Sequence, residues 1–218
     1  MGELPPKPPG LRRCESPNLI TMANPDHIAL AHRYAQGERG LRLEMLDLSE
    51  ANLSGLNFSD AWLRDTNLSG ANLQGCRFVG APMPGTNFTG ADLTQADMHG
   101  AIAAGAIFTQ ATMVGVSLRS GDLYGADLTQ ANLTEADLTQ ADLSLAQASQ
   151  AIFTNAYLTR AILFSTNLTK ADLRGTDLAQ VETVSSANFT EALLPPNYQP
   201  TNNRRRSRFA RGFFGKRK

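Results

Sequence analysis

The sequence predicts a solenoid, a rod in which the chain winds through stacked coils that each bury side chains against the next. Three observations predict it. A five-residue period runs from Leu43 to Leu178 without an insertion or a deletion. A period of five fits neither a helix, at 3.6 residues per turn, nor a strand, at two. Aromatic residues make up only 7% of the chain, so Leu and Ala must supply most of the core.

Each repeat unit has a large residue at its centre and a small residue two positions earlier. Of 28 centres, 18 are Leu and five are Phe, and 18 of the small positions are Ala. The residue before the centre is Asn or Asp in 16 units, and these side chains hydrogen-bond to nearby backbone in turns. Ser or Thr follows the centre in 15 units, and Gly ends the unit in 11. The pattern therefore predicts a turn in every unit.

The consensus A(D/N)LxG resembles the repeat of the pentapeptide repeat family, over roughly two-thirds of the chain. The resemblance implies an all-β solenoid, a right-handed quadrilateral β-helix in which four pentads form one square coil. The centre and the small residue then point inward. Twenty-eight pentads make seven coils, and a strand-like spacing of about 4.8 Å gives a rod about 35 Å long. Cys76 falls at an inward small position, so we expect it to be a core residue.

The chain divides into four segments. After Leu178 the period shifts by one residue, which predicts one extra residue near 180 to 183, and the consecutive prolines at 195 and 196 cannot continue the bonding between coils. The expected segments are a flexible N-terminal segment (1–22), a cap helix and lead-in (23–40), the β-helix (41–194), and a proline-containing exit with a basic tail (195–218).

A short helix is expected to cover the N-terminal end of the rod, because an open β edge promotes end-to-end pairing. Asn24 is the expected N-cap, Pro25 the first helical residue and Gly37 the stop. The following stretch, RYAQGERGL, also resembles the lead-in of cyanobacterial members of the family. His27 and His32 lie five residues apart, not the four that share a helix face, so we interpret both as ordinary helix residues.

Charge is distributed unevenly along a chain whose formal net charge is zero. Residues 41–193 hold 16 acidic and seven basic side chains, a difference of −9, whereas residues 204–218 hold eight basic side chains and no acid. The two cysteines cannot form a disulfide framework, and no metal-ligand spacing is present. Without a bilayer-spanning apolar run or a signal peptide, we expect a cytoplasmic location, with peripheral membrane contact through the tail.

One face of the expected rod differs from the other three. Centres 20 residues apart stack on one face, and Asn, Asp, Ser and Thr dominate the outward positions of three faces. On the face with centres 43, 63, 83, 103, 123, 143 and 163, apolar side chains point outward, which is typical of a binding surface. A protein partner is one occupant, and the N-terminal segment or the tail of this chain is another. The expected partner-binding residues are Trp62, Pro82, Pro84, Ile102, Tyr124, Ile162 and Phe164.

The tail combines basic and aromatic residues. Such clusters suit an anionic lipid surface, where each basic residue contributes about 1 kcal/mol, or an acidic protein. They also suit nucleic acid, although no DNA-reading motif accompanies this one, and a solvated tail is the alternative without function. The residues expected to contact an anionic surface are Arg204, Arg205, Arg206, Arg208, Phe209, Arg211, Phe213, Phe214, Lys216, Arg217 and Lys218.

The sequence favours interaction over catalysis, since a rod filled with Leu and Ala offers no pocket of convergent groups, and we expect no cofactor and no metal. Two classes remain. The first is a regulatory or interaction scaffold, which the resemblance implies for many cyanobacterial members. The second is a DNA mimic that binds DNA gyrase, as other members do. A net charge of −9 over about 35 Å is sparse beside duplex DNA, with one charge per about 1.7 Å, so the scaffold ranks first.

Overall fold

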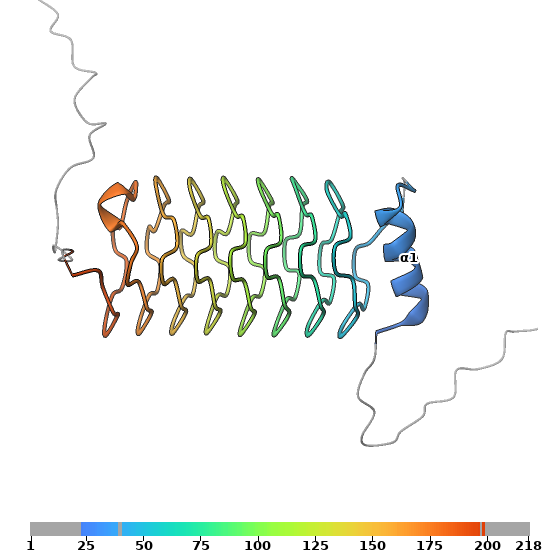
Figure 1. The fold of residues 1–218 in the computed structure, drawn as a ribbon, viewed down its shortest axis with the longest axis horizontal. Helices are drawn as coiled ribbons and strands as arrows, with labels where there is room; N and C mark the ends of the chain where they lie inside the picture. The colour runs from blue at the N-terminus through green and yellow to red at the C-terminus, as the bar shows by residue number, and fades with distance from the viewer. Residues whose placement is uncertain (1–22, 39–40, 197, 199–218) are drawn as a thin grey trace, which may run out of the picture.

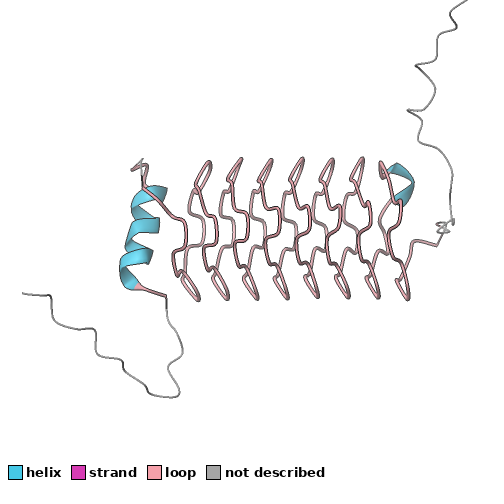
Figure 2. Ribbon diagram, turned by 180° about the vertical axis from the view of Figure 1, so that it is seen from behind, coloured by secondary structure: helices cyan, strands magenta, loops and turns pink. Residues whose placement is uncertain are grey.

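The computed structural model describes residues 23–38, 41–196 and 198, which form a straight rod with a helix across one end (Figure 1). Helix α1 spans Pro25–Ala35, and a short 3-10 helix, η1, spans Leu178–Gln180 near the other end. The described residues contain no extended strand, and isolated parallel bridges join residues 20 positions apart. The described residues between the two helices are drawn as loop (Figure 2). The predicted right-handed quadrilateral β-helix with an N-terminal cap helix is therefore confirmed.

Three backbone hydrogen bonds per pentad connect each coil to the next. The N–H of Leu128 donates to the carbonyl of Gln147 at 2.6 Å, and the N–H of Gln130 donates to Ser149 at 2.9 Å. In return, the N–H of Gln147 donates to the carbonyl of Ala126 at 2.9 Å. The same pattern recurs along most of the rod, so bridges one residue long join successive coils, with gaps such as the one between Trp62 and Pro82, where proline has no N–H to donate.

A tight turn closes every pentad. The N–H of Ala131 donates to the carbonyl of Leu128 at 3.0 Å, and φ at Gln130, the third residue of this turn, is +60°. A positive φ at the third position is the geometry of a type II turn, which favours Gly. Gly occupies this position in 11 pentads, as noted above. Sixteen of the remaining pentads hold other residues in the same left-handed conformation, where bonds to the neighbouring coils keep them, and the last pentad ends in η1.

The core is a column of centres and small residues. Every centre from Leu43 to Leu178 is at most 4% exposed. Stacked coils bring like residues together, and the rings of Phe88 and Phe108 lie parallel with centroids 4.9 Å apart. Cys76 is fully buried as predicted, its Sγ lies 2.9 Å from the carbonyl oxygen of Leu53, and burial raises its pKa to about 11.

Where threonine occupies the inward small position, its buried hydroxyl donates a hydrogen bond to a backbone carbonyl. Thr86 donates from Oγ1 to the carbonyl of Leu63 in the preceding coil at 2.6 Å, and Thr66 and Thr166 make the equivalent bond. A buried hydroxyl without a partner would be destabilising, so these bonds explain why Thr replaces Ala inside the rod.

Helix α1 begins and ends where the sequence predicts. The side chain of Asn24 accepts a hydrogen bond from the N–H of Asp26 at 2.9 Å, and Gly37 follows the helix with φ +102°. Ala31 and Tyr34 are buried against the first coil, and the Tyr34 hydroxyl donates to the carbonyl of Ser59 at 3.1 Å. The helix therefore packs across the end of the rod and covers its core.

The repeat changes register near the C-terminal end. Up to Ile152 and Asp172 the bridged residues are 20 apart, whereas Ile162 pairs with Thr183, 21 apart. Helix η1 takes up the additional residue. This is the insertion that the sequence predicts, and inter-coil pairing continues beyond it in the new register.

Candidate partner-binding face

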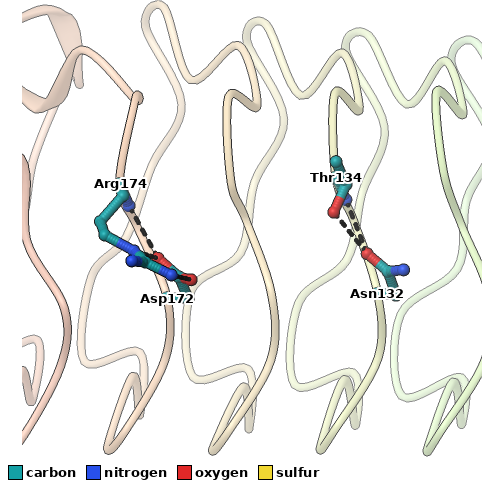
Figure 3. Close-up of polar contacts among 4 residues, drawn as sticks. All are labelled: Asn132, Thr134, Asp172 and Arg174. Carbon is teal, nitrogen blue, oxygen red and sulfur yellow. Dashed lines mark hydrogen bonds and ion pairs between the residues drawn. The ribbon is translucent and has the colours of Figure 1, made fainter.

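A hydrogen bond to backbone holds most outward side chains. In each of the 16 pentads with Asn or Asp before the centre, the side-chain Oδ1 accepts from the N–H two residues later. Asn132 accepts in this way from the N–H of Thr134 at 3.1 Å and from its hydroxyl at 2.6 Å (Figure 3). These are the local turn bonds that the sequence predicts.

Arginine can take the place of the hydroxyl. Arg174 donates from its N–H and its guanidinium to Asp172, with a 2.6 Å contact from Nη2 to Oδ2 (Figure 3). The hydrogen bond from Arg174 holds the pKa of Asp172 below its ordinary value, although burial opposes the shift. The acidic side chains on these faces therefore mainly stabilise the turns by accepting hydrogen bonds, and neighbouring arginines neutralise part of their negative charge.

We define the apolar face as the outward positions of the pentads centred on residues 43, 63, 83, 103, 123, 143 and 163. Its positions before the centre form one ladder, in which Pro82 bridges to Ile102 and, after Asp122 and Asp142, the ladder reaches Ile162. Trp62 lies one coil before Pro82, since the N–H of Leu63 donates to the Pro82 carbonyl. The structure therefore brings these predicted residues onto one side of the rod.

The positions after the centre form a second column on the apolar face. The N–H of Asp65 donates to the carbonyl of Pro84, that of Gly105 to Tyr124, and that of Leu145 to Phe164. This column runs from Arg64 to Phe164 beside the ladder of Pro82 and Ile102. Both columns carry the predicted partner-binding residues, and neither is continuous, because Asp122 and Asp142 interrupt the first.

The apolar residues replace side chains that would stabilise the turn. Ile102 stands where an Asn or Asp would accept from the N–H two residues later, and the N–H of Ala104 has no hydrogen bond among the described residues. The same holds for the N–H of Arg64 after Trp62 and of Phe164 after Ile162. Each of these rungs lacks a bond worth about 1 kcal/mol.

Several of these side chains are open to solvent. Trp62 is 65% exposed, Tyr124 50%, Ile102 46% and Phe164 45%. The exposed part of an apolar side chain contributes nothing to stability and an unmade turn bond lowers it, so the solenoid gains little from these residues. A surface that contributes nothing to the fold is a candidate for binding.

Sequence reasoning missed two members of the apolar face and some apolar residues elsewhere. Met45 and Leu145 occupy the turn position of this face and are exposed, with φ +58° and +59°. The sequence signal that could have identified these two residues is a large apolar residue at a turn position that favours Gly. The other three faces are less uniformly polar than expected, since they expose Ile107, Ile152, Tyr157 and Leu193.

The remaining predicted site lies beyond the described residues. Arg204 to Lys218, including the three tail phenylalanines, fall in residues 199–218, outside the described part of the chain. The described part contains no group of three His, Cys, Asp or Glu side chains placed to hold a metal ion. None of its helices has the length and apolar character needed to cross a membrane.

Comparison with known proteins agrees with this geometry. The model of "Pentapeptide repeats" matches eight copies over residues 39–180, and no curated protein matches the chain. A trypsin-treated form of QnrB1, a plasmid-mediated fluoroquinolone resistance protein, is 20% identical over 65% of this chain and 78% of its own, with a TM-score of 0.51.

Two further solved structures are similar in sequence and have lower TM-scores. HetL, a pentapeptide repeat protein involved in heterocyst differentiation regulation from the cyanobacterium Nostoc sp. strain PCC 7120, is 22% identical over 77% of this chain and 96% of its own, with a TM-score of 0.27. A pentapeptide repeat protein from the Arabidopsis thaliana thylakoid lumen is 30% identical over 48% of this chain and 66% of its own, also with a TM-score of 0.27. With the match to the repeat model covering more than half of its length, the chain belongs to the pentapeptide repeat family.

Proposed function

We propose that this protein is a non-catalytic interaction scaffold that docks a protein partner through its apolar face. The observation that carries the proposal is the replacement of turn-stabilising Asn or Asp by apolar side chains at Trp62, Ile102 and Ile162, of which Trp62 and Ile102 are exposed and Ile162 is partly buried. An aromatic side chain on a rigid support is the kind of residue that dominates binding energy at interfaces. The core is filled with apolar side chains, and among the described residues no buried polar group faces a space that could hold a substrate. This supports a non-catalytic role.

The rigidity of the rod also supports docking. Each inner coil is held by backbone bonds on both sides, so the outward side chains of the apolar face have fixed spacing. A preorganised surface loses little conformational entropy when a partner binds. We further propose that the basic and aromatic tail tethers the scaffold to an anionic surface.

A second candidate is a DNA mimic that binds a topoisomerase such as gyrase. Its support is the −9 net charge of residues 41–193 and the fold likeness to QnrB1. Against it, a net charge of −9 is sparse for a duplex, and basic side chains interrupt the acidic surface, as in the contacts of Arg119 with Asp137 and Lys170 with Glu191. We therefore place the scaffold first.

Affinity capture tests the proposal. The tagged full chain, incubated with lysate of its own cells, is compared with a variant carrying Trp62→Ser, Tyr124→Ser and Phe164→Ser. We expect the variant to lose a protein that the unmodified chain captures, because three exposed rings are removed from one face. Mass spectrometry of the captured proteins provides the measurement.

A matched control removes the same kind of residue from the other faces. Ile107→Ser, Ile152→Ser and Tyr157→Ser also delete three exposed apolar side chains, and this variant should capture the partner normally. Equal capture by both variants would reject docking on the apolar face. Strong inhibition of gyrase supercoiling by the full chain would instead favour the DNA mimic.

A further inference from the structure

We propose that the proline-rich segment of this chain, residues 4–13 (LPPKPPGLRR), lies along the apolar face in the free protein and is displaced by the partner. The inference rests on the proposed function, because it describes how partner binding at the apolar face is regulated. The segment lies outside the described residues, and the proposal is supported by the point where the described chain begins and by the chemistry of the face.

The described chain begins at the same end of the rod as Trp62. Helix α1 crosses that end from the first coil, where His27 contacts Asp47, to the pentad before Trp62, where Tyr34 contacts Ser59. Residues 10–22 lie between the prolines and Ala23, and 13 extended residues span about 43 Å. This reach exceeds the length of the whole rod, about 35 Å by coil spacing, so chain length permits docking anywhere along the face.

The spacing of the face matches a polyproline II segment. Trp62 and Tyr124 lie three coils apart, about 14 Å at 4.8 Å per coil. The five residues from Pro5 to Pro9 span about 15 Å at 3.1 Å per residue. Between the two rings the face carries Pro82, Pro84 and Ile102 and presents few polar groups. Aromatic-lined surfaces of this kind bind prolines, whose rings pack flat and whose missing N–H needs no acceptor.

Charge favours the same arrangement. Asp122 and Asp142 lie on the apolar face beyond Ile102, and neither is in an ion pair among the described residues. Lys7 sits between the two proline pairs, about 6 Å along the segment from Pro5 and from Pro9, so its long side chain would reach Asp122, in the coil of Tyr124, when the prolines cover the rings. The basic Arg42 and Arg64 of the face lie toward its N-terminal end, so the acidic excess is beside Tyr124.

The C-terminal tail fits this strip less well. Its eight basic residues alternate closely with three phenylalanines. A tail packed lengthwise on the face would bring more positive charge against an apolar surface than two aspartates can pair, which is unfavourable. Residues 4–13 carry three basic side chains, Lys7, Arg12 and Arg13, against eight in the tail, and a proline-rich sequence favours the extended polyproline II conformation, so it would lose less entropy on docking.

Trp62 is the only tryptophan of the chain and reports directly on cover of the face. The experiment measures its emission maximum and its quenching by acrylamide in the full chain and in a variant with Pro5, Pro6, Pro8 and Pro9 changed to Ala and Lys7→Glu. We expect the variant to have a red-shifted emission and an acrylamide quenching constant about twofold higher, because a docked segment would cover roughly half of the exposed ring. The variant should also capture more partner than the unmodified chain.

One further variant and a dilution series identify the occupant. A variant with Phe209, Phe213 and Phe214 changed to Ser should leave Trp62 protected from acrylamide. If quenching of Trp62 instead rises in this tail variant and not in the proline variant, the inference is overturned in favour of the tail. Protection that disappears on dilution would point to a second copy and overturn it as well. Equal quenching in the full chain and the proline variant also overturns it, while the capture experiment still decides the proposed function. Conversely, protection by the prolines without any captured protein would reject the docking function and leave the intramolecular contact standing.

Discussion

Ile102 differs from its neighbours by one hydrogen bond. In the next coil Asp122 accepts from the N–H of Tyr124 at 3.0 Å, whereas Ile102 offers nothing to the N–H of Ala104. Ile107 makes the same omission on another face, where Asn87 of the preceding coil still accepts from Thr89. Single residues therefore set the balance between the stability of a turn and the chemistry of the surface.

Restoring the missing acceptor tests this balance. Ile102→Asn and Ile107→Asn should each raise the free energy of unfolding by about 0.5–1.5 kcal/mol, because the new Oδ1 accepts from the N–H two residues later. Urea unfolding followed by circular dichroism measures the change. In the capture assay Ile102→Asn should weaken partner binding and Ile107→Asn should not. A loss of stability in both variants would contradict the assignment of the turn bond.

At the scale of elements, α1 does more than cover apolar side chains. The N–H of Asp47 in the first coil has no preceding coil to bond to, and it donates to Nδ1 of His27 at 2.9 Å. His27 thus replaces a backbone carbonyl at the open edge. The helix supplies both the apolar cover, through Ala31 and Tyr34, and an acceptor for the first rung.

Removing this acceptor should loosen the first coil. His27→Ala is expected to lower the free energy of unfolding by about 1 kcal/mol, because the half-buried N–H of Asp47 loses its partner. Amide hydrogen exchange at Asp47 should accelerate. His32→Ala is the matched control, since the His32 side chain makes no hydrogen bond among the described residues and its loss should change neither quantity. Unchanged exchange at Asp47 in His27→Ala would rule out the capping role.

The whole molecule is asymmetric in both its ends and its charge. Helix α1 closes the N-terminal end, whereas in the last coil the inward residues Val184, Phe189 and Leu194 are only partly buried by the described residues. The rod is acidic, and the eight basic residues of the tail follow this more open end. A long acidic body with one basic end would be oriented by an anionic surface, with its apolar face left free for a partner.

Liposome flotation tests the tether. The full chain should float with vesicles that contain phosphatidylserine and remain behind with vesicles of phosphatidylcholine alone. A variant with Arg204, Arg205 and Arg206 changed to Ser should bind the anionic vesicles more weakly, because each basic residue near such a surface contributes about 1 kcal/mol. Added salt should reduce binding by the unmodified chain. Identical flotation of the two proteins on anionic vesicles would exclude the tail as a lipid tether.

Much of the fold was predictable because it depends on contacts that are close in sequence. The turn bond of each Asn or Asp spans two residues, the type II turn spans four, and the caps of α1 lie next to the helix. The five-residue period repeats these local interactions, and the register shift after Leu178 was visible as a break in that period. Part of the apolar face was also predictable, since residues 20 positions apart stack on one face once four pentads make a coil.

The sequence by itself therefore determined the solenoid, its inward residues and the position of its cap helix, because a periodic chain specifies its own repeating neighbours. Only the tertiary structure decided which groups meet between coils and across the end of the rod. It placed Nδ1 of His27 on Asp47, added Leu145 to the apolar face, and left the N–H of Ala104 without an acceptor among the described residues. The reason is physical: the contact of His27 with Asp47 joins groups that are distant in sequence, whereas the exposure of Leu145 and the lack of an acceptor for the N–H of Ala104 depend on what the neighbouring described coils leave uncovered and unbonded.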